Sequence, residues 1–452
     1  MDRALLSVGL DVGTTSTQMI LSRLTVKNQA SSFAVPKMEI AQREILYRSP
    51  VHFTPLSSGT LVDGAVLRRL VEAEYAAAGI RREDVDTGAV IVTGETSRKE
   101  NAGTVLAELS DLAGDFVVAT AGPDLESILA ARGAGAYEAS KGKRVLHMDI
   151  GGGTSNLCLL EDGKCIQTGC LNVGGRLLKL DETGTITYCS SVLDGITDVQ
   201  VGQIPTGAEL RQLADTLVSA LEMAAGLRMP TDILCKLTTK ETGKTWEIPG
   251  DVVLSFSGGV ADCIRVDYPN LQFGDLGPLL GRAIRESALC RGEYLLGAET
   301  IRATVIGAGC HSVALSGSTV FHQNIAFPLK NIPVVEAKNP QSAEEVRELL
   351  SACEEERVFL AIPGYVSPAY ETVKQLAKIL EEGFGDRQIL VCLQADCAKA
   401  LGQCLKLLTG QRPCICMDGL DVTGETWLDV GTPVGPALPV VIKTLVLSGG
   451  NQ

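Results

Sequence analysis

The chain carries the same short pattern twice, and this repeat constrains the fold more than any other feature. Each copy is an apolar run of strand type that ends in an aspartate followed by glycine and hydroxyl residues; the copies occupy residues 5–15 and 145–155. Further strand-like runs follow each copy, and helical patterns follow the strands. The repeat therefore predicts two related α/β halves that face each other, each built on a strand–turn–strand unit.

Each repeated turn combines groups that suit the phosphates of a nucleotide. Glycine lets the backbone approach a phosphate closely, and hydroxyl groups donate hydrogen bonds to phosphate oxygens. A carboxylate cannot contact phosphate favourably, so Asp11 and Asp149 are expected to hold Mg²⁺, in part through water. The expected phosphate contacts are Gly13, Thr14 and Thr15 in the first turn and Gly151, Gly152, Gly153 and Thr154 in the second.

A third glycine turn follows the apolar run at residues 251–257. Gly258 and Gly259 lead from this run into a short apolar helix. Because both lack side chains, they leave a flat surface on which an adenine or a ribose can lie. Taken alone, a strand-to-helix turn of this kind is common in proteins of any function.

The character of the chain changes near the proline-containing segment 327–333. Beyond it, strand and helix patterns alternate, and Ser342 with Glu345 forms a signature for the start of a helix. Alternation of this kind is typical of a separate α/β unit. We therefore expect three units: a first lobe over residues 1–142, a second lobe over residues 143–330 and a C-terminal α/β domain over residues 331–452.

Composition argues against several classes of function. A net charge of −14 disfavours nucleic acid or an anionic membrane surface as a partner. No apolar run reaches the ~18 residues of a membrane-spanning helix, and Asp11 interrupts the first apolar run before the core of a secretion signal can form. An intracellular protein is expected, with its 14 cysteines reduced and without the ligand spacing of a zinc site.

Together, the two phosphate turns and the third glycine turn resemble the ATPase signature of the actin/Hsp70/sugar-kinase superfamily. Order and spacing agree over residues 5–285, and residues 121–135 and 276–283 resemble the two helices that connect the lobes. The resemblance implies two actin-like lobes of ribonuclease-H-like fold around a cleft. It also implies ATP and Mg²⁺ as cofactors, with closure of the lobes controlled by the nucleotide.

Hydrolysing relatives often carry a carboxylate on the first connecting helix that orients the attacking water. The corresponding segment offers Asp124 and Glu126. Glu126 is the favoured candidate by resemblance to the polyphosphatase branch, and Asp149 can share the task. Slow, Mg²⁺-dependent hydrolysis that acts as a timer is expected.

Longer segments resemble one family within the superfamily, the ethanolamine-utilisation reactivases. The segments are residues 93–102, 121–133, 305–319 and 440–446. Proteins of this kind use ATP to release damaged cobalamin from ethanolamine ammonia-lyase, so that intact adenosylcobalamin can enter. The resemblance implies that enzyme as the partner and the cytoplasm or an ethanolamine-utilisation microcompartment as the location. The oligomeric state stays open, with a homodimer among the options.

Other functions are compatible with the same turns. A small-molecule kinase of this fold is the main alternative, but it needs an acceptor pocket and a base for the substrate hydroxyl, and no sugar-specific polar cluster is evident. A filament-forming module is a further option, whereas an electron-transferring activase is disfavoured by the cysteine spacing. A dinucleotide site at residues 307–312 is also disfavoured, because Ser312 stands where the last glycine of that fingerprint belongs.

Overall fold

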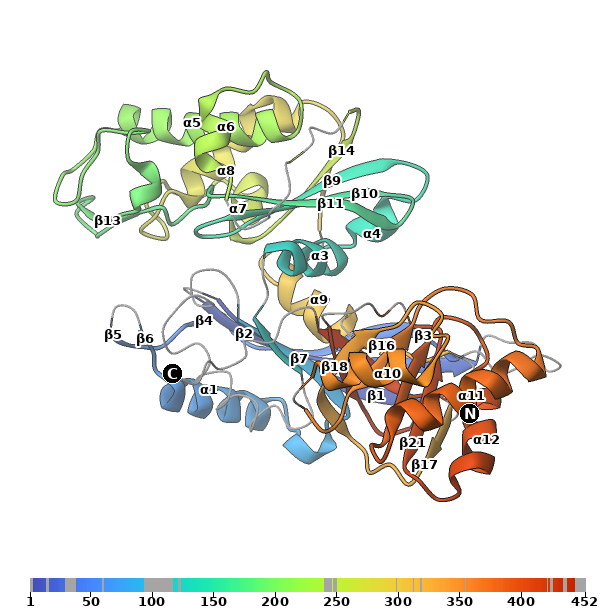
Figure 1. Ribbon diagram of the computed structural model, residues 1–452. Coiled ribbons are helices and arrows are strands. Elements are labelled where there is room, and N and C mark those ends of the chain that lie inside the picture. The colour runs from blue at the N-terminus through green and yellow to red at the C-terminus, as the bar shows by residue number, and fades with distance from the viewer. Residues whose placement is uncertain are drawn as a thin grey trace.

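Three large β-sheets organise the protein, as the computed structural model in Figure 1 shows. The described residues are 3–13, 16–28, 38–58, 61–92, 117–120, 123–239, 246, 250–297, 299–311, 313–317, 319–353, 355–420, 422, 426–433 and 437–443. Within this part of the chain, no helix is long and apolar enough to cross a membrane.

The first lobe is built on a sheet with the strand order β3-β2-β1-β7-β8, and β4 (His52–Phe53) pairs with β2 beside this path. Three antiparallel strands come first and two parallel strands complete the sheet: β1 (Arg3–Val12), β2 (Ser16–Asn28), β3 (Met38–Arg48), β7 (Thr87–Val92) and β8 (Val117–Thr120). Helix α1 (Gly64–Ala77) starts at Asp63, whose side chain accepts a hydrogen bond from Val66 N. A short hairpin of β5 (Leu56–Ser58) and β6 (Leu61–Val62) precedes this helix.

The second lobe repeats the topology of the first, with the order β11-β10-β9-β14-β15. Its strands are β9 (Arg144–Ile150), β10 (Ser155–Glu161), β11 (Lys164–Leu171), β14 (Val253–Ser257) and β15 (Tyr294–Leu296). The turns match as well, because Gly13 N donates to Ser16 O and Gly151 N donates to Thr154 O, both at 2.9 Å. The predicted duplication and the predicted actin-like α/β fold class are therefore confirmed.

Helices and one small hairpin cover the second sheet. They are α4 (Ala136–Ala139), α5 (Gly207–Ala224), α6 (Asp232–Leu237), α7 (Gly259–Arg265), α8 (Gly277–Glu286) and the hairpin of β12 (Leu178–Leu180) and β13 (Ile186–Cys189). Thr206 and Glu209 cap the start of α5 reciprocally, since each side chain accepts a hydrogen bond from the backbone N–H of the other. The leucine stripe of α5 is buried in the core of this lobe, as expected.

Two helices cross between the lobes (Figure 1). Helix α3 (Pro123–Gly133) follows the first sheet but packs on β9, β10 and β11 of the second. Helix α9 (Ala303–His311) follows the second sheet but packs on β1, β2 and β7 of the first, and it also contacts α3. The assignment of residues 276–283 as the second connecting helix was therefore wrong. That segment belongs to α8, which packs on α5 and α7 inside the second lobe.

The crossing helices approach each other backbone to backbone. A Cβ added to Gly307 would lie 2.0 Å from the carbonyl oxygen of Leu129, and one added to Gly133 would lie 1.8 Å from that of Ala303. The same helix rests closely on β1, because a Cβ at Gly9 would lie 2.5 Å from Val305 O. The glycines of residues 307–309 thus permit close helix packing, which is a structural reason for the near-match to a dinucleotide fingerprint.

The C-terminal unit is built on an eight-stranded sheet with the order β16-β23-β22-β18-β19-β20-β21-β17. Its parallel strands are β18 (Leu329–Glu336), β19 (Phe359–Ile362), β20 (Ile389–Leu393) and β21 (Cys414–Asp418), connected by α10 (Ala343–Ser351), α11 (Tyr370–Phe384) and α12 (Ala398–Thr409). The antiparallel strands are β16 (Val313–Leu315), β17 (Phe321–Gln323), β22 (Trp427–Val430) and β23 (Pro439–Lys443). Successive residues of β19 and β20 enter two different cores, so both faces of this sheet are buried.

The sheet of the C-terminal unit begins earlier than residue 331. Both β16 and β17 come from the chain before that residue, directly after α9. Val441 of β23 also shares a small apolar core with Leu5 and Leu24 of the first lobe, so these two parts of the protein are packed together. The division into domains at residues 142 and 330 stays a prediction.

The close helix crossing makes Gly307 sensitive to the smallest side chain. We expect Gly307→Ala to lower the free energy of unfolding by about 1–3 kcal/mol, because the added methyl group must push α3 and α9 apart. The thermal unfolding midpoint measures this loss. Gly207→Ala in the first turn of α5 is the matched control, since a Cβ there meets no atom within 4 Å. Equal midpoints for the two variants would contradict the proposed backbone contact.

Candidate functional site

Strand residues beside the two repeated turns both bond to the segment that leads into α9 or to its first turn. From the second lobe, Asp149 accepts a hydrogen bond from Thr304 Oγ1 at 3.5 Å. From the first lobe, Gln18 donates through Nε2 to the carbonyl oxygen of Ile301 at 3.2 Å, and Gln18 pairs with Asp11 across β1 and β2. Asp11 and Asp149 are thus brought to the same region by strands that are far apart in sequence.

Asp149 is buried and held by named partners. The residue is 7% exposed, and Ser257 Oγ donates a hydrogen bond to its Oδ1. Burial raises the pKa of Asp149 to about 6, and the hydrogen bonds from Ser257 and Thr304 limit that rise. A carboxylate in this setting gains from a nearby cation, because a cation offsets the loss of its hydration.

His147 completes a buried hydrogen-bond chain behind Asp149. Its Nε2 lies 2.9 Å from Ser257 Oγ and its Nδ1 lies 3.0 Å from Ser255 Oγ. Burial lowers the pKa of His147 to about 3, so the ring is neutral. Since Ser257 gives its proton to Asp149, its oxygen accepts from Nε2–H, and Nδ1 accepts from Ser255. The chain of groups fixes the Ser257 hydroxyl and, through it, the orientation of Asp149.

A buried amide lies beside each of the two aspartates. Gln18 pairs with Asp11 and Asn156 pairs with Asp149 at equivalent positions of the two sheets. The two residues are 4% and 2% exposed, and neither Gln18 Oε1 nor Asn156 Oδ1 has a hydrogen-bond partner among the described residues. Each amide oxygen is therefore an unmet acceptor inside the protein, beside the strand position of one aspartate.

These residues fit a hydrated magnesium ion rather than a bare one. Within the described part of the chain, no three Asp, Glu, His or Cys side chains gather closely enough to hold a metal. Mg²⁺ keeps several waters and takes phosphate oxygens in nucleotide sites, so one or two carboxylates are sufficient. Asp11 and Asp149 would hold it, in part through its waters.

The glycines of the candidate nucleotide site differ in whether packing requires them. Gly258 has φ of +87°, and a Cβ there would lie 2.3 Å from Ile150 O, so packing of the turn on β9 already requires glycine. A Cβ added to Gly259 would lie 3.8 Å from Cδ1 of Ile301, an ordinary contact, so packing does not require glycine there. A Cβ at Gly153 would meet nothing within 4 Å, which leaves its backbone open to a phosphate.

Arg176 supplies a positive charge that the sequence analysis missed. Its backbone N–H donates to Gly152 O at 2.6 Å, so the residue lies directly on the second turn. Its Nε donates to Asp275 Oδ2 at 3.1 Å, and Asp275 Oδ1 accepts from Gly277 N at the start of α8. In the sequence, the Gly174-Gly175-Arg176 run after β11 is the feature that could have indicated Arg176. Its position beside the glycine turn is evident only in the folded chain.

Some predicted site residues are untested by this structure. Thr14, Thr15 and the segment 93–102 lie outside the described residues. Glu126 lies in the first turn of α3, which packs against the second sheet. The neighbouring Asp124 accepts a hydrogen bond from Thr168 of β11 and so has a structural role. Glu126 stays a prediction as the residue that orients water.

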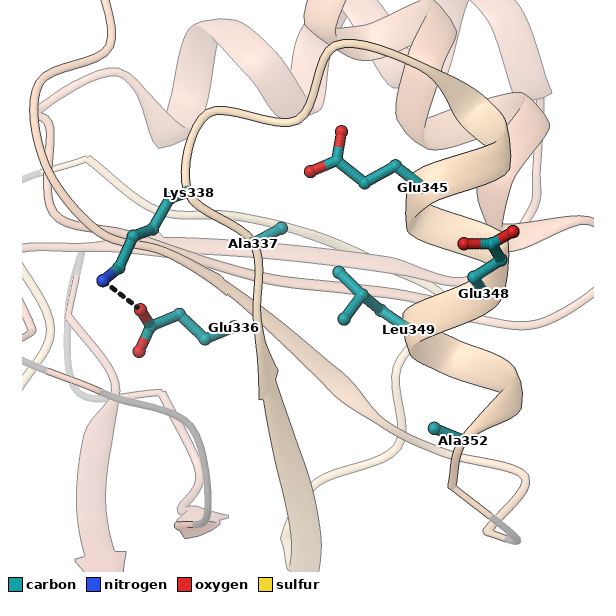
Figure 2. Close-up of a pocket in the computed structure, with 7 residues that line it drawn as sticks. All are labelled: Glu336, Ala337, Lys338, Glu345, Glu348, Leu349 and Ala352. Carbon is teal, nitrogen blue, oxygen red and sulfur yellow. Dashed lines mark ion pairs between the residues drawn. The ribbon is translucent and has the colours of Figure 1, made fainter.

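A separate hollow lies in the C-terminal unit (Figure 2). It has a volume of about 400 Å³ and lies between the end of β18 and α10. Its lining carries three carboxylates and one ammonium group, and that ammonium group, of Lys338, lies 3.7 Å from Glu336 Oε1. An excess of negative charge repels phosphate, so this hollow is not a candidate nucleotide site.

Burial of Asp149 makes stability depend on pH in a defined direction. Because its pKa is raised from 3.8 to about 6 in the folded chain, ionisation destabilises the fold as the pH rises through that value. Asp149→Asn removes this cost and keeps an acceptor for Ser257. Without nucleotide or metal, we expect the free energy of unfolding of the variant to exceed that of the wild type by a margin that grows from about pH 4 and reaches on the order of 3 kcal/mol above about pH 6.

Thermal unfolding midpoints at several pH values measure this difference. Asp215→Asn is the control, because Asp215 lies on α5 with 53% of its side chain exposed. If the unfolding midpoints of both variants change with pH as that of the wild type does, burial does not raise the pKa of Asp149.

Comparison with known proteins places the chain in a family. The sequence matches the family described as ethanolamine utilisation protein EutA over residues 3–448. It is 37% identical to the ethanolamine ammonia-lyase reactivase EutA of Salmonella typhimurium and 38% identical to that of Escherichia coli, with 98% of each chain covered in both comparisons. The solved Aquifex aeolicus PPX-GPPA enzyme is a distant likeness, at 12% identity and a TM-score of 0.43 over 68% of this chain and 99% of its own. This chain belongs to the ethanolamine utilisation protein EutA family.

Proposed function

We propose that this protein is an ATP-dependent reactivase of ethanolamine ammonia-lyase. The observation that carries the proposal is the match over 98% of the chain to two proteins with that name. In the proposed reaction, the protein releases damaged cobalamin from the client enzyme and lets intact adenosylcobalamin enter. The kinase alternative is not favoured, because both of these relatives are reactivases.

The nucleotide site of this proposal lies between the two repeated turns. Asp11 and Asp149 hold Mg²⁺ with water, and Gly13, Gly151, Gly152, Gly153 and Thr154 face the phosphates together with Thr14 and Thr15. The adenosine lies against the turn of Gly258 and Gly259. Mg²⁺ would neutralise phosphate charge and polarise the bond to the terminal phosphate. The open backbone at Gly153 supports this arrangement, since a Cβ there would meet no atom within 4 Å.

The segment before α9 offers a route from nucleotide to lobe movement. On the second lobe, Gly258 N donates to Thr300 O at 3.0 Å. On the first lobe, Arg48 pairs with Glu299 at 2.8 Å, and Arg302 donates to Ser49 O at 3.1 Å. A nucleotide that contacts the Gly258 turn therefore affects residues 299–302, which are bonded to both lobes. Different affinities of ATP and ADP for two lobe arrangements would then supply the energy.

Reactivation with pure components tests the function. We expect ethanolamine ammonia-lyase inactivated with a tightly bound damaged cobalamin to regain activity with this protein, ATP, Mg²⁺ and adenosylcobalamin. Omission of ATP should prevent recovery, because the nucleotide drives the exchange. No recovery with all components present would refute the proposal. Location in the cytoplasm or a microcompartment, and a homodimeric state, stay predictions.

Substitution of the acidic residues tests the site. Asp11→Asn and Asp149→Asn should each lower ATP hydrolysis at least about tenfold, since each removes a charge that holds the metal. Glu126→Gln should lower hydrolysis but leave ATP affinity unchanged, because the residue acts on water rather than on the nucleotide. Phosphate release and equilibrium binding of ATP measure the two effects, with Asp215→Asn as the control. Normal hydrolysis in both aspartate variants would contradict the assignment.

A further inference from the structure

Arg176 connects three parts of the site that are distant in sequence. Its side chain lies along the second glycine turn, since a Cβ placed on Gly152 would be 3.5 Å from Cβ and Cδ of Arg176. Its Nε is bonded to Asp275. Its guanidinium carbon lies 6.0 Å from the centre of the Phe53 ring, which belongs to β4 of the first lobe.

The guanidinium group retains unused hydrogen-bonding capacity. Among the described residues, only its Nε has a hydrogen-bond acceptor, so both terminal nitrogens are available to a ligand. Two terminal N–H groups in one plane suit the oxygens of a phosphate. Asp275 holds the guanidinium group by its Nε, and the Asp275 side chain is itself 8% exposed and accepts a hydrogen bond from Gly277 N.

The contact with Phe53 is weak enough to be exchanged for a better partner. A separation of 6.0 Å is the outer limit of cation–π attraction, and Phe53 is 81% exposed. The terminal phosphate of a nucleotide carries a full negative charge and attracts a guanidinium group more strongly than an exposed ring does. A protein of net charge −14 also needs a local cation where it binds a polyphosphate.

We propose that Arg176 distinguishes ATP from ADP by binding the terminal phosphate. With ADP, the guanidinium group stays between Asp275 and Phe53. With ATP, its terminal nitrogens turn to the third phosphate over Gly152 and Gly153, and the contact with the first lobe is released. The contact between Arg176 and Phe53 across the lobes therefore depends on whether a third phosphate is bound. This inference rests on the proposed function, because it requires a nucleotide at the second turn.

Equilibrium binding of Mg²⁺ with a non-hydrolysable ATP analogue, and separately with ADP, tests the proposal. Arg176→Gln should weaken binding of the analogue at least about tenfold, and binding of ADP by less than about threefold. Arg176→Lys keeps the charge without the planar pair of donors, so an intermediate loss is expected. Arg211→Gln is the control, because Arg211 is a partly exposed arginine of α5 in the same lobe and pairs with Asp215 and Glu286. It should change neither affinity.

The outcomes separate this inference from the proposed function. Equal losses for the analogue and ADP, or no loss for either, overturn the role of Arg176 while nucleotide binding by the protein stands. Failure of the wild-type protein to bind either nucleotide overturns both proposals. Thermal unfolding midpoints establish that each variant is folded, and if Arg176→Gln is not, the Arg176→Lys variant decides by the same comparison of the two affinities.

Discussion

Backbone contact between α3 and α9 is the constraint on which the arrangement of the two lobes depends. Each helix follows one sheet and packs on the other, and glycine at positions 133 and 307 lets the two helices touch without side chains between them. Such a contact tolerates little change in the separation of the two helices. The same geometry places Thr304, near the start of α9, beside Asp149.

The electrostatics of the site follow from this placement. Asp149 is a buried acid whose pKa is raised, and a neutral His147 holds its serine partner in one orientation. Among the described residues, two buried amide oxygens have no donor, and Arg176 lies on the glycine turn with an acceptor only at its Nε. A buried acid and a cation thus lie along the second glycine turn, where we propose that a metal–phosphate complex binds. The hollow of the C-terminal unit has no comparable balance of charge.

Much of the fold was predictable because it is encoded locally. The repeated turns, the capping box of Thr206 and Glu209 and the alternating elements after residue 331 depend on short patterns, and the structure confirms them. The second connecting helix was misplaced because its identity depends on which sheet it packs against, which spacing alone does not reveal. Arg176 and His147 were missed for the same reason. Their partners Asp275 and Ser257 are about a hundred residues away in sequence and come into contact only through folding.

The central claim is that a nucleotide with Mg²⁺ binds between the two repeated turns, and a structure of this protein with a non-hydrolysable ATP analogue tests it most directly. The account predicts phosphates between the turns of Gly13 and Gly151, a metal within reach of Asp11 and Asp149 directly or through water, and the adenosine beside Gly259. An analogue bound elsewhere, for example in the hollow beside α10, or phosphates bound without contact to either turn, would contradict it.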